Sequence, residues 1–469
     1  VLARLEPIFL LRPPNPPPPA PRAHLRSALD PDKRSAVMAS VEFEAALLPT
    51  DEEGGQPGES GEETGEAAPG CLSEYLGKFR GAGSPSAGGR PPLSQTACSF
   101  AGSFAGIAAL GLINVLLLKL DDPQHVVVLV GSFGAMAVLL FSAYKAPLAQ
   151  PKNVLVGNTV GGVIGVAAVE ALRLAGLSDC FWLTGALAVS LTIAVQERLG
   201  AVHPPGGATA LIYVTAKPVQ SMGFIYAICP SLFGGMVMIL VAMLSNNASE
   251  ARTYPQGWGH LAVDESAQKA KAPEGAHPPA GYLRKFGGAG VAGPPVPPWR
   301  ETLFSFLGSF AGIAALGLLD ALVLTRLLPA NGVPLLKLLC GPFGAMAVLV
   351  FSACKAPLAQ PKNAVLGSTL GGIVGVAVFF ALQQVGLAQK QWLSGALAVS
   401  LTIALQEQLG CVHPPGGATA LTFAIMPVFQ AMKAWYVLCP TLLGTLVTVA
   451  LGVLANNASP ARTYPQSWM

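Results

Sequence analysis

Charged residues are scarce in this chain, in which Asp, Glu, Lys and Arg make up 11% of 469 residues. Apolar residues make up 52%, and the mean hydropathy is +0.53. In water-soluble domains about a quarter of the residues are charged, so this composition excludes a water-soluble protein. The formal net charge is only +3, and the Lys and Arg are scattered, which offers no basic patch to a nucleic acid. We expect an integral, multi-pass protein of the lipid bilayer.

Metal-binding and catalytic patterns are missing as well. The eight cysteines form no Cys-x-x-Cys pair, and the sequence contains no His-Glu-x-x-His. Each copy of an internal duplication offers one matched His and one matched Glu, which are too few ligands for a zinc site. We therefore expect no metal, no cofactor and no catalytic residues, and the chain is not predicted to be an enzyme.

Long apolar runs are present instead, and they come in two copies. Runs of about 18 to 23 residues are long enough to cross a ~30 Å hydrocarbon core as helices. The stretch from Gly102 to Leu112 recurs from Gly308 to Leu318, and from Phe141 onward the copies are 210 positions apart. The sequence predicts an all-α, polytopic bundle of two tandem repeats, each with about four to six membrane helices and one broken helix.

Each repeat is predicted to contain six helical runs. In the first repeat, 71–255, they cover 98–118, 126–144, 153–174, 181–197, 206–216 and 221–244. In the second, 282–469, they cover 303–324, 335–354, 363–385, 391–407, 416–426 and 433–454. Residues 256–281 are predicted to be a polar linker, and the Pro-rich, acidic residues 1–70 to be disordered. Met38 resembles a translation start, so residues 1–37 are interpreted either as untranslated or as a transit segment.

The positions of lysine indicate how the repeats insert. Lys145 and Lys152 recur as Lys355 and Lys362. An even number of crossings per repeat would gather these and most other Lys and Arg on one side, as the positive-inside rule favours. We therefore expect two parallel repeats. The short run at 206–216 then either supplies a sixth crossing or follows a re-entrant path.

The two copies are most alike around the broken helix. His203-Pro204-Pro205-Gly206-Gly207 recurs as His413-Pro414-Pro415-Gly416-Gly417, each time after Gln-Glu and before a short apolar run. Two successive prolines suit only the first turn of a helix. Breaks inside a membrane usually line a cavity or a binding site. We therefore predict a substrate-binding or translocation site at this break.

Several side chains around the break fit an anion path. Gly206, Gly207 and Thr209 open the new helix, where free amide protons would attract an anion. We expect valine at either glycine to block binding more than it harms folding. Lys145 and Asn153 offer charge and hydrogen-bond donors, although Lys145 also suits a simple topological anchor. The second-copy equivalents are Gly416, Gly417, Thr419, Lys355 and Asn363.

Three further residues are candidates with open alternatives. Gln196 and Glu197 end an apolar helix, where a carboxylate is costly. Glu197 is interpreted either as a proton-coupling group or as the salt-bridge partner of a loop lysine. His203 either titrates near neutral pH or caps the new helix through its ring. The second-copy equivalents are Gln406, Glu407 and His413.

The last helix of each repeat ends in a duplicated motif. Asn246-Asn247-Ala248-Ser249 recurs as Asn456-Asn457-Ala458-Ser459, followed in both copies by Ala-Arg-Thr-Tyr-Pro-Gln. Each contains an Asn-x-Ser sequon. Because the duplication extends beyond the sequon, we interpret the motif as a structured helix terminus and not as a glycan acceptor.

The motifs resemble those of the HPP family of integral membrane proteins. The resemblance rests on His-Pro-Pro-Gly-Gly-Ala-Thr-Ala after Gln-Glu, and on Lys-Ala-Pro-Leu-Ala-Gln-Pro-Lys-Asn between the second and third helices. It implies membrane transport of a small inorganic anion, with nitrite transport across the plastid envelope linked to some members. The chain lacks the CBS domains of bacterial relatives, so nucleotide regulation is not expected. A homo-oligomer stays open, and the alternative function is a non-transporting structural or sensor protein.

Overall fold

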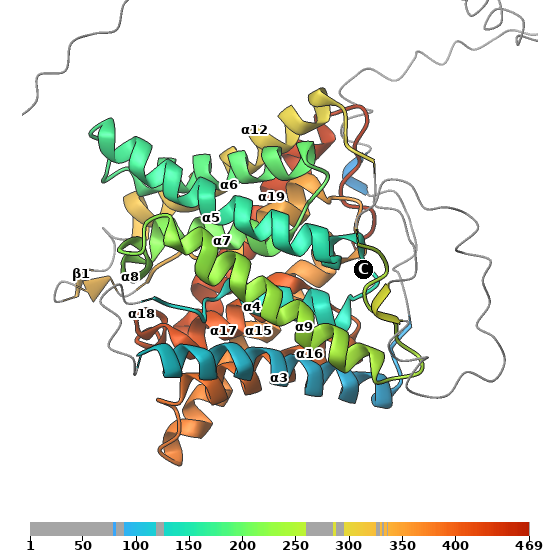
Figure 1. Ribbon diagram of the computed structural model, residues 1–469. Helices are drawn as coiled ribbons and strands as arrows, with labels where there is room; N and C mark the ends of the chain where they lie inside the picture. Colours follow the sequence, from blue (N-terminus) through green and yellow to red (C-terminus); the bar gives the residue numbers. More distant parts are fainter. Residues whose placement is uncertain are drawn as a thin grey trace, which may run out of the picture. The chain divides into compact units, whose positions relative to one another are not determined.

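The computed structural model describes residues 78–80, 89–118, 126–258, 285–287, 295–324, 329–330, 333–334 and 336–468 (Figure 1). The segment predicted to be disordered, 1–70, lies outside these ranges, as do the two interpretations of residues 1–37. Most of the predicted linker, 256–281, lies outside them too.

The first repeat is a series of helices. Its elements are η1 (Lys78–Arg80), α3 (Leu93–Leu118), α4 (Ser132–Ala137) with η2 (Val138–Ser142), η3 (Pro147–Ala149), α5 (Pro151–Leu174), α6 (Phe181–Arg198), α7 (Pro204–Thr215), α8 (Lys217–Gln220) and η4 (Ala227–Leu232) with α9 (Phe233–Asn247). The elements η2 and η4 are π-helical extensions of their neighbours, whereas η1 and η3 are 3₁₀ turns.

The second repeat follows the same order. Its elements are η5 (Lys285–Gly287), α12 (Trp299–Leu319) with η6 (Asp320–Leu324), β1 (Pro329–Ala330), β2 (Val333–Pro334), α14 (Pro342–Ala347) with η7 (Val348–Ser352), η8 (Pro357–Ala359), α15 (Pro361–Gln384), α16 (Gln391–Leu409), α17 (Pro414–Ile425), α18 (Pro427–Gln430) and η9 (Val437–Leu442) with α19 (Leu443–Asn457). The antiparallel pair β1 and β2 contains the only strands in the described ranges. The all-α prediction is confirmed.

Six helices of the described chain are long and apolar enough to cross a membrane, three in each repeat. They cover Leu93–Leu117, Pro151–Leu174, Ala227–Asn247, Trp299–Leu322, Pro361–Gln384 and Val437–Asn457. The helices α6 and α16 are 18 and 19 residues long and contain the polar Gln-Glu pair in their last turns. The prediction of a polytopic membrane bundle is confirmed.

The second apolar run of each repeat is a helix over only part of its length. We expected helices over 126–144 and 335–354, but residues 126–130 and 336–340 have no regular secondary structure and the helices cover 132–142 and 342–352. Asn114 Oδ1 accepts a hydrogen bond from the amide of Val128 at 2.8 Å, and Asp320 accepts one from the amide of Leu338 at 3.1 Å. A side chain from the preceding helix thus satisfies the non-helical backbone, as a buried amide requires. We call α4 (with η2) and α7, and their second-repeat equivalents α14 (with η7) and α17, the four short helices.

The starts of α3 and α5 lie at the same end of the bundle as the ends of α6 and α9. The Asn153 amide at the start of α5 donates to Val202 O, beyond α6, at 2.9 Å. The Arg252 guanidinium, beyond α9, donates to Gln95 Oε1 in the first turn of α3 at 2.5 Å. We call this end of the bundle the loop end, because it also contains the loop between η2 and α5 (Figure 1).

The other end collects the opposite termini. Asn114, near the end of α3, bonds the non-helical segment before α4. Lys337, in the matching segment of the second repeat, donates to Thr215 O at the end of α7 at 3.4 Å. The helix α7 therefore runs from near the loop end toward the opposite end.

The two repeats pack as one unit related by a pseudo-two-fold axis. The helix α3 lies against α16, and α12 lies reciprocally against α6. On the axis, α4 packs on α17, and α14 packs on α7. Lys145 and Lys355 line one shared cavity, so they lie at the same end of the bundle. The prediction of parallel repeats is confirmed.

The centre of this packing is very tight. Ala135, Ala208, Ala345 and Ala418, one from each short helix, form a cluster from which water is fully excluded. A Cβ added to Gly134 would lie 2.8 Å from the backbone nitrogen of Ala418. Small residues therefore let the backbones of the four short helices touch, as is typical of membrane helices.

Candidate functional site: a cavity between the repeats

A cavity of about 980 Å³ lies between the repeats at the loop end. Both repeats contribute matching loops, 142–148 and 352–358. The side chains of Lys145 and Lys355 are exposed and line the cavity, one from each repeat. Neither has an ion-pair partner among the residues that the structure describes. The cavity therefore has a positive group on each side of the pseudo-two-fold axis.

The four short helices close this cavity toward the opposite end. Ser142 lines the cavity, and Ala135 of the same helical segment belongs to the buried alanine cluster. Seven residues of helix separate the two, a distance of roughly 10 Å. Because the alanines are fully buried, the structure is open at the loop end and closed in the middle.

The N-terminus of α7 offers no free amide. The ring nitrogens of Pro204 and Pro205, at the first two helical positions, carry no proton. The amide of Gly206 donates to His203 O at 3.0 Å, and the amide of His203 donates to Gln196 Oε1 at 3.1 Å. The expectation that unpaired amides await an anion there is therefore wrong. The prolines suit this position because a buried helix start has few partners for its amides.

The glycines after the prolines are packing sites. A Cβ at Gly206 would overlap the Gly157 carbonyl, and one at Gly207 would lie 2.7 Å from Val348 Cγ2 and overlap the Gly344 carbonyl. In the second copy, the same additions at Gly416 and Gly417 would overlap the carbonyls of their own neighbours, Gly367 and Gly134. The expectation that valine here spares folding is wrong, because the obstacle is backbone from a neighbouring helix.

Gln196 holds the break together. Its Nε2 donates to Gly157 O at 2.9 Å and to His203 O at 3.1 Å, while its Oε1 accepts from the His203 amide. Gln406 makes the same three bonds in the second repeat. Both side chains are fully buried. Gln196 thus satisfies the backbone where the chain leaves α6 and turns into α7.

His203 does not cap α7 with its ring, so that alternative is wrong. Its Nδ1 lies 2.8 Å from Leu148 O, and because a carbonyl only accepts, Nδ1 carries the proton. His413 contacts Leu358 O in the same way at 2.7 Å. Each ring therefore ties the break to the neighbouring cavity loop. The Nε2 atoms of both rings are buried without a partner in the described chain.

Thr209 and Thr419 have different surroundings. Thr209 Oγ1 lies 2.7 Å from Asn158 Oδ1 and 3.0 Å from Ser132 Oγ, within a buried polar cluster. Thr419 donates to Pro415 O in its own helix. Sequence explains the difference, because Pro342 and Ser368 stand where the first repeat has Ser132 and Asn158.

The asparagines at the starts of α5 and α15 serve the backbone. Asn153 donates to Val202 O, and Asn363 donates to Val412 O at 3.3 Å. Asn363 also lines the cavity. Of the predicted site residues, four line the cavity: Lys145, Lys355, Asn363 and Glu407. The other predicted residues do not line it.

The two carboxylates at the ends of α6 and α16 reach across to the opposite repeat. Glu407 Oε1 accepts from Ser99 Oγ at 2.7 Å, and Glu197 Oε1 accepts from Ser305 Oγ at 2.6 Å. The residues are 4% and 2% exposed, and each Oε2 atom is buried without a partner in the described ranges. Within the described residues, neither carboxylate pairs with a lysine, so the interpretation as a salt bridge to a loop lysine is wrong.

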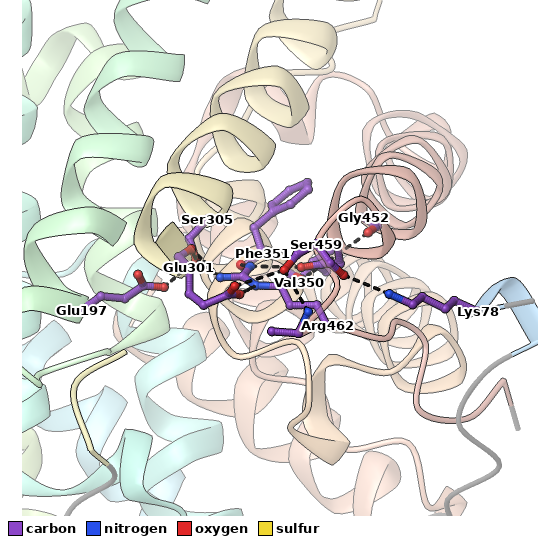
Figure 2. Close-up of polar contacts among 11 residues, drawn as sticks. Lys78, Glu197, Glu301, Ser305, Val350, Phe351, Gly452, Ser459 and Arg462 are labelled. Atoms are coloured by element: carbon purple, nitrogen blue, oxygen red, sulfur yellow. Dashed lines mark hydrogen bonds and ion pairs between the residues drawn. The ribbon is translucent and has the colours of Figure 1, made fainter. Parts of the chain in front are cut away.

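An arginine stands behind each of these serines. Arg462 Nη2 donates to Ser305 Oγ at 2.9 Å, and Nη1 donates to Phe351 O at 2.7 Å (Figure 2). Its Nε pairs with Glu301. Figure 2 shows Glu197 directed at Ser305 from the other repeat. Arg252 donates to Ser99 Oγ at 2.9 Å in the first copy. Each site is therefore a chain of arginine, serine and glutamate that joins the repeats.

Sequence reasoning did not single out these serines and arginines as parts of the site. The available signal was duplication: Ser99 recurs as Ser305 inside apolar helices, and Arg252 recurs as Arg462 in the motif after the last helix. That motif is a structured terminus, because the sequon residues Asn247 and Asn457 are buried and hydrogen-bonded to Tyr254 and Tyr464, respectively. This interpretation is confirmed.

Within the described ranges, no group of three or more His, Cys, Asp or Glu side chains gathers in a way that could hold a metal ion. The charged and hydroxyl side chains of the site are the lysines that line the cavity and the glutamate, serine and arginine residues described above.

The sequence is similar to known proteins. The family model for the HPP transmembrane region matches residues 89–255 and 294–465, one match for each repeat. Two transmembrane proteins of Dictyostelium discoideum are similar to it. One is 37% identical over 187 residues, which are 40% of this chain and 64% of the relative. The other is 39% identical over 173 residues, which are 36% of this chain and 53% of the relative. The chain thus spans less than two thirds of these relatives, and no solved structure matches it. Because the family match covers both repeats and more than half of its length, the chain belongs to the HPP family of integral membrane proteins.

Proposed function

We propose that this protein transports a small inorganic anion across its membrane, through the interface between the two repeats. The observation that carries the proposal is the cavity on the pseudo-two-fold axis, lined by Lys145 and Lys355 without counter-ions in the described chain. Two lysines facing one water-accessible cavity raise the local concentration of an anion. Nitrite is the proposed substrate, and the plastid envelope the proposed membrane, from the family resemblance alone.

The short helices supply the barrier that such a transporter needs. A transporter must not be open at both ends at once, and its substrate route commonly lies where membrane helices are discontinuous. Here α4, α7, α14 and α17 meet at the buried alanines below the cavity. In the proposed cycle the anion enters at the loop end, and the four short helices then separate to release it. No catalytic step is proposed.

Uptake into proteoliposomes tests the proposal. Purified protein is reconstituted, and concentration series of nitrite, nitrate, bicarbonate and chloride are measured against protein-free vesicles. At a separation of about 10 Å in water, each lysine stabilises an anion by about 0.4 kcal/mol. The variant with both Lys145→Gln and Lys355→Gln should therefore raise KM roughly fourfold and leave kcat nearly unchanged.

The matched control is Lys217→Gln, which removes an exposed lysine at the opposite end. This variant should transport like the wild-type protein. If folded wild-type protein moves none of the four anions faster than protein-free vesicles, the transport proposal is wrong. The alternative function, a structural or sensor protein whose break only shapes the bundle, would then be favoured.

A further inference from the structure

We propose that Glu197 and Glu407 are proton-binding sites, and that a proton crosses the membrane together with the anion. The coupling rests on the proposed transport function, whereas proton binding stands on the structure of the two sites. The inference follows from where these carboxyl groups lie, what they lack, and how their serine partners are held.

In each carboxyl group, one oxygen has a hydrogen-bond partner and the other has none in the described residues. One oxygen of Glu407 accepts from Ser99, while Oε2 is buried and has no partner in the part of the chain that the structure describes. The same holds for Glu197 with Ser305. A buried carboxylate oxygen that accepts no hydrogen bond is costly, and this unmet cost is what points to proton binding here. Glu407 also lines the cavity, from which a proton can reach it.

The hydroxyl of Ser99 can serve both protonation states without any backbone movement. Ser99 Oγ lies 2.7 Å from Glu407 Oε1 and 2.9 Å from Phe141 O, and it accepts from Arg252 Nη2. A hydroxyl has one proton to donate and two lone pairs to accept with. When Glu407 is ionised, Ser99 donates to it.

Protonation reverses this bond. The proton comes from the acidic bathing solution through the cavity and binds Oε1 of Glu407. The new O–H then donates to Ser99 Oγ, and the Ser99 hydroxyl turns to donate to Phe141 O. Arg252 keeps its bond to Ser99 throughout, so no buried donor is left without an acceptor.

The second copy has the same two settings. Ser305 Oγ lies 2.6 Å from Glu197 Oε1 and 3.2 Å from Glu301 O, and it accepts from Arg462 Nη2 at 2.9 Å. When Glu197 is protonated, Ser305 would donate to Glu301 O, a carbonyl of α12. In the first copy the corresponding acceptor is Phe141 O, near the end of η2. Both sites thus combine a carboxyl from one repeat with a serine and an arginine from the other.

The charged and titratable groups around the sites determine which way anion binding acts. On the elements packed around Glu407, and along its cavity, they are Cys98, Tyr144, Lys145, Arg252, Glu301, Lys355, Lys362, His413 and Arg462. On α6 and the elements packed around Glu197 they are Lys152, Glu170, Arg173, Arg198, His203, Arg300, Glu301, Cys354, Lys355 and Arg462. The cavity cations favour the ionised carboxylates, and a bound anion offsets those cations. Anion binding therefore favours protonation.

Linkage makes this coupling reciprocal. If an anion in the cavity increases the proton affinity of Glu407, a proton on Glu407 increases the affinity for the anion by the same factor. Two species that favour each other's binding enter and leave together. The expected mode is therefore symport of proton and anion in one direction.

Proton binding is measured on the purified full chain by infrared difference spectroscopy between acidic and alkaline pH. The protonated-carboxyl band should titrate in the wild-type protein and be lost in the double variant with Glu197→Gln and Glu407→Gln. Glutamine keeps the acceptor oxygen for the serine, and thermal stability is measured to verify folding. The matched control, Glu170→Gln, removes an exposed carboxylate paired with Arg173 and should leave the band intact.

Coupling is measured in vesicles with a trapped pH dye, using nitrite and nitrate, with protein-free vesicles to subtract diffusion of undissociated acid. An acidic exterior should accelerate wild-type uptake and, for one proton carried with each anion, drive about tenfold accumulation per pH unit. The double variant should still move anions, without this response.

Four outcomes are informative. A titrating band lost in the double variant, with a pH-driven flux lost in the same protein, supports the proposal. No titrating band at these residues overturns proton binding, whatever the flux. Wild-type flux that ignores the pH gradient overturns coupling and leaves anion transport standing. The absence of any anion flux overturns the proposed function and the coupling together, while the infrared result still decides proton binding.

Discussion

Replacing Gly207 by alanine should destabilise the protein, although alanine is normally the better helix residue. Gly207 lies in α7, where a new Cβ would be 2.7 Å from Val348 Cγ2 and would overlap the Gly344 carbonyl. Carbon atoms pack best at about 3.5 to 4.0 Å, so the added methyl group is roughly 1 Å too close. The backbone of α14 cannot turn away as a side chain could.

Two opposing effects determine the magnitude. Alanine gains about 1 kcal/mol of helix propensity over glycine. Overpacking a tight core costs typically about 1 to 3 kcal/mol, and more where backbone must shift. Because the obstacle at Gly207 is the backbone carbonyl of Gly344, we expect an overpacking cost at the upper limit of that range. The free energy of unfolding should therefore fall by about 2 kcal/mol in Gly207→Ala.

The matched control is Gly235→Ala in α9. Its Cβ would meet only side chains, Leu155 and Val154, at 3.6 Å, which is ordinary contact. This variant should be as stable as the wild-type protein or more so, by up to about 1 kcal/mol. The assay is thermal unfolding in detergent, followed by the loss of monodisperse protein. Equal midpoints for Gly207→Ala and Gly235→Ala would refute the packing role of Gly207.

The break and the orientation can be tested in the same way. Gln196→Leu removes the partner of the buried His203 amide and a second donor from the carbonyls of Gly157 and His203, so it should destabilise the protein by about 1 to 3 kcal/mol in the same thermal assay. The exposed Gln383→Leu should have little effect, and an unchanged midpoint for Gln196→Leu would contradict its bridging role. Single cysteines at positions 145 and 355, in a cysteine-free background, should react with an impermeant maleimide from the same side of the membrane. Reaction from opposite sides would contradict parallel repeats.

The two-repeat plan could be predicted because its signal is contained in the sequence. Duplicated apolar runs and matched lysines do not depend on tertiary contacts. The non-helical start of the second run was missed, since Val126 to Val130 are apolar residues compatible with either helix or strand. The deciding contact comes from Asn114 on the preceding helix, and composition does not reveal that bond.

For the candidate site, the sequence indicated unusual polar residues but not their contacts, and only Lys145, Lys355, Asn363 and Glu407 of them line the cavity. Gln196, Glu197 and His203 were found because polar residues are conspicuous in apolar surroundings. Their partners lie on other elements, so sequence spacing could not supply them. Ser99 was missed because a serine in a membrane helix is equally well explained by a bond to its own backbone, and Ser99 does lie 3.2 Å from Gln95 O. Its contact with Glu407 joins residues 308 positions apart.

That long separation has a consequence for the synthesis of the protein. The helix α3 is made early, but it packs on α16, which leaves the ribosome only after most of the chain has been inserted. Until α16 is made, Ser99 has no Glu407 to donate to. Likewise, Glu197 on α6 has no Ser305 to accept from until α12 is made. Native pairing of the repeats therefore completes late in translation. A chain that stops before α16 should leave the α16-facing side of α3 open to lipid and to quality-control proteases, and one that stops before α12 should leave the α12-facing side of α6 open as well.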